Sequence, residues 1–393
     1  FKNAETAANL FGLKEFGNIY TRIMNPTCDV LEKRVAALEG GMAAVAVGSG
    51  QAASAYCILN VAKAGDNVVA STDLYGGTVN LFKNQLRLQG VEVRFADPAD
   101  PKNFEKLTDD KTRAYYGESC PNPYLRVFPI KEVADIGRKK GIPLFIDNTA
   151  SPVICKPLAH GAAVVMHSLT KYIGGHGTSI GGIIVDGGNF DWTKDRKRQP
   201  LMNEPDQSYN GAIWADAVPQ LTGANIPFAI RARVVLLRDL GAPLSPFNAF
   251  QIIQGLETVA LRMKQHCVNA EKVVAFLETQ KKVTNVIYPT NHQGEIKERA
   301  KRYMQGGYGS LVGMDVGTRE AGSKFIDNLK MLYHVANIGD ARSLAIHPAT
   351  TTHSQLNDEE LLAAGVTPGY VRLSIGIEHP DDIIADIKQA LAA

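Results

Sequence analysis

A lysine among hydroxyl residues is the first candidate for chemistry. The segment Ser168-Leu169-Thr170-Lys171 directly follows the apolar run Val164–His167, and the glycine-rich residues 174–177 come after it. An amine at the end of a buried strand is partly desolvated, which lowers its pKa and makes it nucleophilic. By itself, Lys171 fits a solvated surface charge better, because most lysines in proteins are exposed.

A carboxylate follows another apolar run. Asp147 comes directly after Leu144–Ile146. Burying a carboxylate is costly unless it has a partner. Asp147 therefore either caps a loop, which is the commoner case, or holds a charge that must stay ionised in a dry pocket.

Two further segments follow strand-like runs. Gly48-Ser49-Gly50-Gln51-Ala52-Ala53 comes after Ala43–Val47 and opens a helical stretch, so its glycines and free N–H groups could hold an anion. It also matches the dinucleotide-binding fingerprint, although a tight strand-to-helix turn explains it about as well. Tyr75, after Val68–Ala70, could stack on a flat ligand, but a partly buried core tyrosine explains it better when it is taken alone.

Together, these segments predict a pyridoxal phosphate site. The carboxyl ends of parallel strands meet at one edge of a sheet, where open sheets bind their ligands. Lys171 would form the Schiff base and Asp147 would keep the ring nitrogen protonated. Tyr75 would stack on the ring, and the glycine turn and the hydroxyls would hold the phosphate. A nicotinamide cofactor would explain the glycine turn but not Asp147 and Lys171.

Hydrophobic periodicity predicts the elements that must position these side chains. β-Branched runs alternate with amphipathic stretches, which implies parallel strands, right-handed crossovers and helices on both faces of the sheet. The expected strands are Ala43–Val47, Val68–Ala70, Val91–Phe95, Ala114–Tyr116, Leu144–Ile146, Val164–His167 and Ile183–Val185. The expected helices are Asp29–Leu38, Gln51–Ala62, Thr78–Leu88 and Ile130–Lys140.

A second α/β block follows this first one. The Gly-, Pro- and Asn-rich stretch Gly187–Pro227 interrupts the alternation, and a long helical region, Asn248–Thr279, comes next. The remaining residues predict strands and helices of a smaller C-terminal domain. The expected strands are Val286–Tyr288, Leu311–Val316 and Val371–Ile375, and the expected helices are Gly322–Lys330 and Asp381–Leu391.

Composition limits the class of protein. The 393 residues carry 42 Lys+Arg and 40 Asp+Glu, for a net charge of +2, and 45% are hydrophobic. The length predicts two or three domains. The balance of charge argues against nucleic-acid binding, and no apolar run approaches the roughly 20 residues that span a bilayer. Five scattered cysteines indicate free thiols in a reducing compartment. The charged first 20 residues do not resemble a signal peptide, and a start at Phe1 leads us to expect residues before it.

The motifs resemble those of one family, the Cys/Met-metabolism pyridoxal-phosphate enzymes. It includes cystathionine γ-synthase, cystathionine γ-lyase, methionine γ-lyase and O-acetylhomoserine sulfhydrylase. The likeness runs from Tyr20-Thr21-Arg22 to Val371–Gly376, and Ser168–Lys171 with Gly175-His176 matches the family's Schiff-base signature. The resemblance implies an α/β fold of PLP-dependent transferase fold type I, aspartate-aminotransferase-like. Its large domain has a mostly parallel sheet, and a smaller α/β domain lies at the C-terminus.

The resemblance also implies domain boundaries and roles. Residues 1–30 would form an arm that reaches a neighbouring subunit, 31–235 the cofactor-binding domain and 236–393 the C-terminal domain. Lys171 would carry the cofactor and then shuttle protons, and Tyr75 would assist the loss of the leaving group. The cofactor would be bound by Lys171, Asp147, Tyr75, Gly50, Gln51, Ser168 and Thr170, and by Tyr20 and Arg22 from the arm of a neighbour. The substrate would be bound by Arg372, Ser343 and Asn122. Active sites shared in this way need at least a dimer, and the family is usually tetrameric.

Three features favour the sulfhydrylase branch of the family. Arg342 stands where cystathionine and methionine lyases carry an acidic residue, and an arginine would repel the distal ammonium of cystathionine. Tyr75-Gly76-Gly77 lacks the nearby cysteine of methionine γ-lyases, and Gly187–Pro227 is long, as in sulfhydrylases. Cys120, near Asn122, is best explained as a small buried hydrophobe.

The implied reaction is γ-replacement in methionine biosynthesis. O-acetyl-L-homoserine and sulfide, or another sulfur donor, would give L-homocysteine and acetate. The acyl group of the substrate could equally be succinyl. A methionine γ-lyase or a cystathionine γ-synthase or γ-lyase is the alternative. We expect a cytoplasmic homotetramer with no metal ion and no nucleic-acid or membrane partner.

Overall fold

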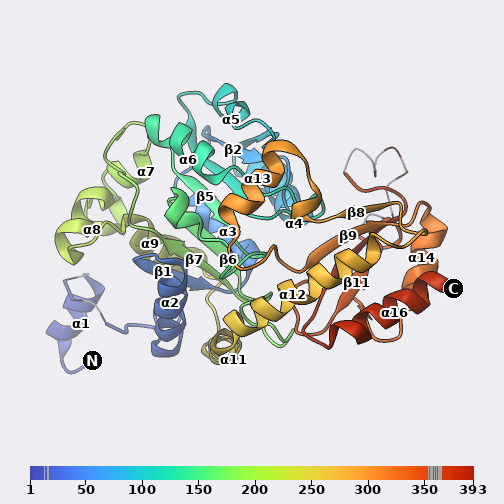
Figure 1. The fold of residues 1–393 in the computed structure, drawn as a ribbon. Helices are drawn as coiled ribbons and strands as arrows, with labels where there is room; N and C mark the ends of the chain where they lie inside the picture. The colour runs from blue at the N-terminus through green and yellow to red at the C-terminus, as the bar shows by residue number, and fades with distance from the viewer. Residues whose placement is uncertain are drawn as a thin grey trace.

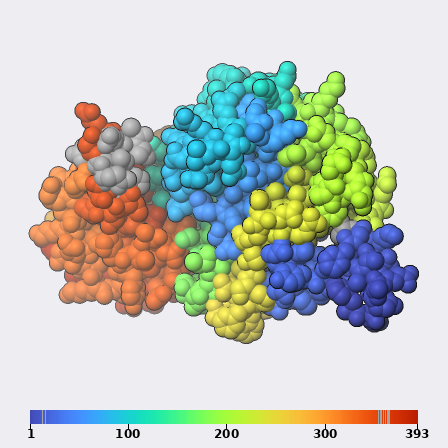
Figure 2. Space-filling view, turned by 180° about the vertical axis from the view of Figure 1, so that it is seen from behind, coloured from blue at the N-terminus to red at the C-terminus, as the bar shows by residue number. Residues whose placement is uncertain are grey.

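Two β-sheets with their covering helices make up the molecule. The computed structural model describes residues 1–12, 14–15, 17–352, 354, 357, 359, 361 and 365–393. Figure 1 shows the larger sheet in the N-terminal half of the chain and the smaller one beside it, with the long helix α12 (Val259–Leu277) running between them. Figure 2 shows the N-terminal residues, in dark blue, and the C-terminal part, in orange, at opposite ends of the molecule.

The larger sheet has seven strands in the order β1-β7-β6-β5-β4-β2-β3. Their bounds are β1 Ala43–Val47, β2 Asn67–Ser71, β3 Glu92–Ala96, β4 Thr112–Glu118, β5 Leu144–Asp147, β6 Val164–Ser168 and β7 Gly182–Asp186. Strands β2 to β6 pair in parallel, as predicted, but β7 is antiparallel to both β1 and β6. No helix intervenes between β6 and β7, and without such a crossover the chain turns back antiparallel. The fold is therefore mixed α/β with a mostly parallel large sheet.

Helices cover both faces of this sheet, which explains its apolar strands. In β5, Leu144 and Ile146 pack in one core cluster with α2 and α6, whereas Phe145 faces the other cluster with α3, α8 and α9. The bounds are α2 Pro26–Glu39, α3 Gly50–Leu59, α4 Gly76–Asn80, α5 Lys102–Lys106, α6 Ile130–Lys139, α7 Pro200–Asn203, α8 Trp214–Thr222, α9 Pro227–Arg231 and α10 Arg238–Leu240. Two π-helical turns, Leu81–Leu86 and Ala232–Leu237, continue α4 and α9, and short 3-10 turns occupy Pro157–His160 and Gln207–Tyr209.

The smaller sheet has five strands in the order β10-β11-β12-β9-β8. Their bounds are β8 Asn285–Ile287, β9 Leu311–Asp315, β10 Tyr333–His334, β11 Leu344–Ile346 and β12 Tyr370–Ser374. Its core contains residues of α12, α14 (Arg319–Asp327) and α16 (Pro380–Ala392). Helix α13 is Gly294–Tyr303, and 3-10 turns lie at Pro289–Asn291 and Pro348–Thr350. Strands β10 and β11 were not predicted, because elements of two or three residues show no period. Helix α13 was not predicted either, although it has 10 residues.

The long helical region is two helices instead of one. It divides at Thr258 into α11 (Pro246–Glu257) and α12. Buried polar side chains on α12 then bind main-chain oxygens of both halves of the molecule. Arg262 donates to the carbonyls of Tyr172 and Ile173 at 2.7 and 3.1 Å, and His266 Nδ1 donates to the carbonyl of Ile375 at 2.6 Å. Helix α12 thus connects the turn after β6 to the end of β12.

The N-terminal helix lies apart from both cores. Helix α1 (Ala4–Phe11) buries none of its residues, and Figure 1 shows it beyond α2 at the edge of the molecule. Within the described residues, every helix is too short or too polar to cross a bilayer. The boundaries at residues 30 and 235 stay predictions.

Candidate active site

One cavity of about 250 Å³ lies where the larger sheet meets the smaller one. It is lined by residues at or just beyond the carboxyl ends of β1, β2, β4, β5 and β6, and by residues near β9, β10 and β12. The predicted site residues in its wall are Gly50, Gln51, Tyr75, Asn122, Asp147, Ser168, Thr170, Lys171 and Arg372. The edge-of-sheet argument therefore identifies residues that do lie together.

Lys171 follows β6 in a tight turn. Its N–H donates to the carbonyl of Ser168 at 3.2 Å, and its own carbonyl accepts from Gly175 N–H at 2.7 Å. Burial, with a smaller contribution from the positive Arg372, lowers the pKa of Lys171 to about 8. Its Nζ donates a hydrogen bond to Asn337 Oδ1. The turn thus presents an amine that is far easier to deprotonate than a surface lysine.

Two carboxyl groups face the cavity from adjacent strands. Asp147 ends β5 and Glu118 ends β4, and the two residues are paired in register. Burial raises the pKa of both, and the negative charge of Asp147 adds to the increase at Glu118. Asp147 accepts a hydrogen bond from Thr149 N–H at 2.9 Å. A cationic ligand atom beside this pair would relieve the cost of its charge.

An anion cradle lies at the N-terminus of α3. Ser49 caps this helix, accepting from Ala52 N–H at 3.1 Å, so the first N–H groups of α3 open towards the cavity wall. A Cβ on Gly50 would come within 2.7 Å of Ser168 Cβ, so only glycine permits this approach. The hydroxyls of Ser168 and Thr170 line the same wall. These donors suit a phosphate group.

The ring of Tyr75 lies at the rim of the cavity. Its N–H donates to Glu118 at 2.6 Å, and its side chain packs so closely on Gly77 that a Cβ there would lie 2.4 Å from the ring. Gln51 Nε2 donates to the Gly77 carbonyl at 2.9 Å. The residue is 55% exposed, which leaves room for a ring to stack on it.

Arg372 lies in β12 on the opposite wall. Its Nη2 donates to the carbonyl of Asn337 at 3.0 Å, and burial lowers the pKa of its guanidinium. Among the described residues, none accepts a hydrogen bond from Arg372 Nε or donates one to Asn122 Oδ1, although both atoms are buried. Buried polar atoms are normally satisfied, so these two indicate a ligand.

Three predicted site residues lie outside this cavity wall. Tyr20 is exposed, and the guanidinium of Arg22 lies over its ring at 5.3 Å. Ser343 is buried, and its hydroxyl donates to Glu378 at 2.9 Å and accepts from Gly376 N–H at 2.8 Å. Arg342 also lies outside the cavity and pairs with Asp340 at 3.2 Å. The roles predicted for these residues stay predictions.

Sequence reasoning missed Glu118, Thr149 and Asn337 in the cavity wall. The strand predicted at 114–116 extends to Glu118, so a longer strand would have identified this carboxyl group by the same edge-of-sheet argument. Thr149 accepts from Ser168 N–H at 2.7 Å and belongs to the segment that follows Asp147. No sequence signal places Asn337 beside Lys171.

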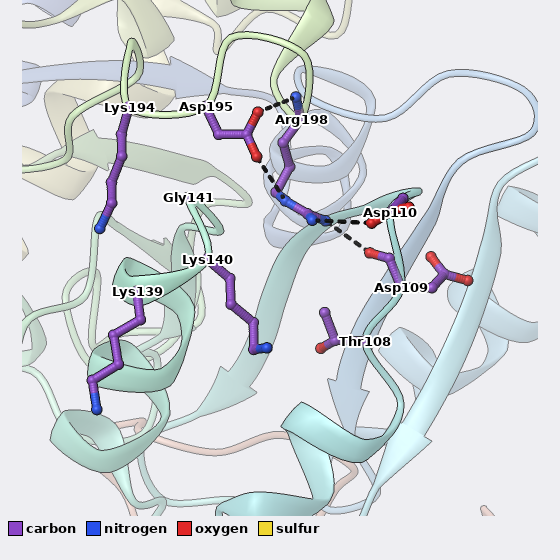
Figure 3. Close-up of a pocket in the computed structure, with 9 residues that line it drawn as sticks. All are labelled: Thr108, Asp109, Asp110, Lys139, Lys140, Gly141, Lys194, Asp195 and Arg198. Atoms are coloured by element: carbon purple, nitrogen blue, oxygen red, sulfur yellow. Dashed lines mark hydrogen bonds and ion pairs between the residues drawn. The ribbon is translucent and has the colours of Figure 1, made fainter.

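A second hollow, of about 350 Å³, lies at the opposite ends of the parallel strands (Figure 3). It is lined by Thr108, Asp109, Asp110, Lys139, Lys140, Gly141, Lys194, Asp195 and Arg198. Figure 3 shows Arg198 between Asp195 and Asp110, with ion-pair distances of 3.4 and 3.6 Å. Asp109 pairs with Arg94 and Lys140 pairs with Glu105. The hollow is therefore mainly a set of ion pairs.

The first cavity therefore fits pyridoxal phosphate and an amino-acid carboxylate. It combines an amine of lowered pKa, a buried carboxyl pair, a stacking ring, an anion cradle and a buried guanidinium with unmet hydrogen-bonding capacity. A nicotinamide cofactor would use the cradle but would leave Lys171 and Asp147 without a purpose.

Sequence comparison identifies relatives along the whole chain. The family model described as Cys/Met metabolism PLP-dependent enzyme matches residues 1–392. O-acetyl-L-homoserine sulfhydrylase of Leptospira meyeri is 52% identical over 100% of this chain and 89% of that protein. O-acetyl-L-homoserine sulfhydrylase 1 of Thermus thermophilus is 48% identical over 100% and 92%, and homocysteine/cysteine synthase of Saccharomyces cerevisiae is 43% identical over 99% and 90%.

A solved structure shows the same fold. The crystal structure of a Campylobacter jejuni protein matches with a TM-score of 0.94 and 41% identity, over 100% of this chain and 93% of that one. That protein carries a pyridoxyl phosphate group covalently on a lysine.

Proposed function

The chain belongs to the Cys/Met metabolism PLP-dependent enzymes, and from this premise we propose that it converts O-acetyl-L-homoserine and sulfide to L-homocysteine and acetate. The observation that carries the proposal is the identity of 43–52% to proteins named O-acetyl-L-homoserine sulfhydrylase or homocysteine/cysteine synthase, over 99–100% of this chain. A methionine γ-lyase or a cystathionine enzyme is not favoured by these relatives. The chemistry of the cavity agrees with a PLP-dependent transferase.

The cavity at the carboxyl ends of the strands would hold the cofactor through hydrogen-bond donors and through a carboxylate. The N–H groups of Gly50 and Gln51 and the hydroxyls of Ser168 and Thr170 would bind the phosphate. Asp147 would pair with the ring nitrogen, and Tyr75 would stack on the ring. When bound, pyridoxal phosphate supplies an electron sink that makes loss of a proton next to the substrate's amine accessible at neutral pH.

The protein's own groups then bind the substrate and move its protons. Arg372 holds the α-carboxylate with a planar, two-pronged contact, with Asn122 beside it. Lys171 Nζ takes a proton from Cα and delivers it to another atom of the bound reactants, which leaves the amine free to take a proton from Cβ, while Tyr75 assists the departure of acetate from Cγ. Sulfide adds at Cγ, and Lys171 returns the protons. Ser343 would help to position Arg372, because its hydroxyl accepts a hydrogen bond from Gly376 N–H just after the end of β12.

The assembly is a homotetramer with active sites shared between pairs of subunits. Residues 1–30 form the arm, 31–235 the cofactor domain and 236–393 the C-terminal domain. Exposure supports this arrangement, because Phe1, Phe11 and Tyr20 are each more than half exposed in one subunit. Tyr20 and Arg22 then contact the phosphate in a neighbouring subunit. The five free, buried cysteines agree with a cytoplasmic enzyme.

Paired incubations test the reaction. The protein is incubated with O-acetylhomoserine and sulfide, with O-succinylhomoserine and sulfide, and separately with methionine. We expect homocysteine and acetate from the first mixture and much less homocysteine from the second. Rapid release of ketobutyrate from methionine would show a γ-lyase instead.

A further inference from the structure

Asn337 contacts two of the candidate site residues, Lys171 and Arg372. Its side-chain Oδ1 accepts from Lys171 Nζ, and its main-chain carbonyl accepts from Arg372 Nη2 at 3.0 Å. These two acceptors are independent, because only the first belongs to the side chain. Asn337 also lines the cavity.

The chain around Asn337 is held in place. Asn337 N–H donates to Val335 at 2.9 Å, and Gly339 N–H donates to Ser374 Oγ at 3.0 Å. Gly339 has a φ of +71°, and a Cβ there would lie 2.6 Å from the ring of Tyr172. The segment is therefore fixed on one side by β12 and on the other by the residue after Lys171.

We propose that Asn337 is a further catalytic residue: its carboxamide oxygen holds the Lys171 amine whenever that amine is free, and favours its charged form. The inference rests on the proposed function, since it assigns Lys171 to the cofactor. A carbonyl oxygen accepts from an ammonium more strongly than from a neutral amine. Asn337 therefore opposes the two effects that disfavour the charge, burial and the nearby Arg372.

The side chain of Asn337 acts on the pKa of Lys171 in addition to the charged groups nearby. Arg372 repels an ammonium, whereas Asp147 and Glu118, which line the same cavity, attract one when ionised. Alanine at 337 removes an acceptor and leaves these charges in place. Aspartate at 337 supplies a charged acceptor of almost the same shape. The two substitutions should therefore move the pKa of Lys171 in opposite directions.

Because Arg372 is bound by the main chain of Asn337, a change of the side chain should affect Lys171 and not Arg372. Arg372 keeps its bond to the carbonyl of residue 337 in any variant of this side chain. Substitution of Asn337 by alanine should therefore lower kcat and leave KM for the amino-acid substrate within about twofold. A general loss of structure would instead change both constants and the thermal midpoint.

Cofactor rebinding measures the state of the amine without turnover. The full chain is stripped of pyridoxal phosphate, and the rate at which visible absorbance returns is followed against pH. Only the neutral amine reacts, so the rate rises around the pKa of Lys171, with a midpoint near 8 for the wild type. We expect N337A to move the midpoint down and N337D to move it up, each by about one pH unit, which is tenfold in rate well below the midpoint.

Three further variants serve as controls for this experiment. Lys140→Ala, a lysine of the second hollow, should give the wild-type profile. Lys171→Ala should give no adduct after borohydride reduction. An adduct of the wild-type protein on another lysine would overturn the assignment of Lys171 to the cofactor, and this inference with it. With the adduct on Lys171, midpoints of N337A and N337D that do not move in opposite directions would overturn the role of Asn337. Asn337→Ser, which keeps a shorter acceptor, should fall between alanine and wild type, and it replaces N337A if that variant does not fold.

Discussion

Two hollows at opposite ends of one sheet contain lysines with opposite properties. Lys171, at the carboxyl ends, lies in a cavity with one neutral acceptor and a like charge, and burial lowers its pKa to about 8. Lys140, at the amino ends and labelled in Figure 3, has a side chain that pairs with Glu105 at 3.2 Å and is 37% exposed. The amino-end hollow is lined by more charged side chains than the carboxyl-end cavity.

The difference shows that the number of charged side chains alone does not make a reactive site. At the amino ends Asp109, Lys140 and Arg198 each have an ion-pair partner. At the carboxyl ends Lys171, Asp147 and Arg372 are partly buried, and Arg372 Nε has no hydrogen-bond partner among the described residues. A ligand can supply that missing partner.

The contrast between the two hollows depends most strongly on Lys171 being the reactive amine. We expect Lys171→Ala to lose the visible absorbance of the bound cofactor and to lower kcat at least ~10²–10⁴-fold, the contribution of a lost acid–base group. Lys140→Ala is the matched control. Absorbance spectra and steady-state rates measure both, and full turnover by Lys171→Ala would contradict the assignment.

The buried carboxyl pair gives the next largest effect. Asp147→Asn keeps the shape of the side chain and removes the charge that faces the ring nitrogen. We expect kcat to fall about 10²–10³-fold, the usual cost of one preorganised electrostatic group, and the affinity for pyridoxal phosphate to fall as well. Equilibrium dialysis and rate measurements test this. An unchanged rate would mean that Glu118 carries the charge instead.

Stability against pH tests the burial of Lys171 itself. The pKa of about 8 in the folded chain lies below the value near 10.4 in the unfolded chain, so between these values the unfolded chain binds more protons. Raising the pH across this window therefore stabilises the folded state. We expect cofactor-free Lys171→Met to have the higher thermal midpoint at pH 7, with the gap closing as pH approaches 10. A gap independent of pH would show that Lys171 is not desolvated.

The smallest effect is expected in the amino-end hollow. Lys140→Ala removes one solvated ion pair, so the free energy of unfolding should fall by about 0–1 kcal/mol, with kcat and KM unchanged. Chemical denaturation and the standard assay measure these quantities. A clear loss of activity would give this hollow a function that its geometry does not indicate.

Much of the carboxyl-end cavity could be predicted, because parallel strands bring residues distant in sequence to a common edge. Asp147 and Lys171 were identified by that rule together with the cost of burying charge. Glu118 was missed because the predicted strand ended at Tyr116. Asn337 was missed because its contact with Lys171 depends on how the two sheets pack, which no local pattern encodes. The strand β7 was predicted, but its antiparallel direction was not, because no helix separates it from β6 and the alternating pattern was read as parallel throughout.

Helix α12 has a consequence for chirality. Its buried Arg262 and His266 fasten the turn that carries Lys171 and the end of the strand that carries Arg372, so the separation of amine and guanidinium is fixed by a helix that touches neither. When the carboxylate is held at Arg372 and the substrate's amino group is held at the cofactor, the α-carbon presents one definite side to the base. Only one enantiomer of an amino acid then turns its Cα–H bond towards the base, so handedness is selected partly from outside the cavity.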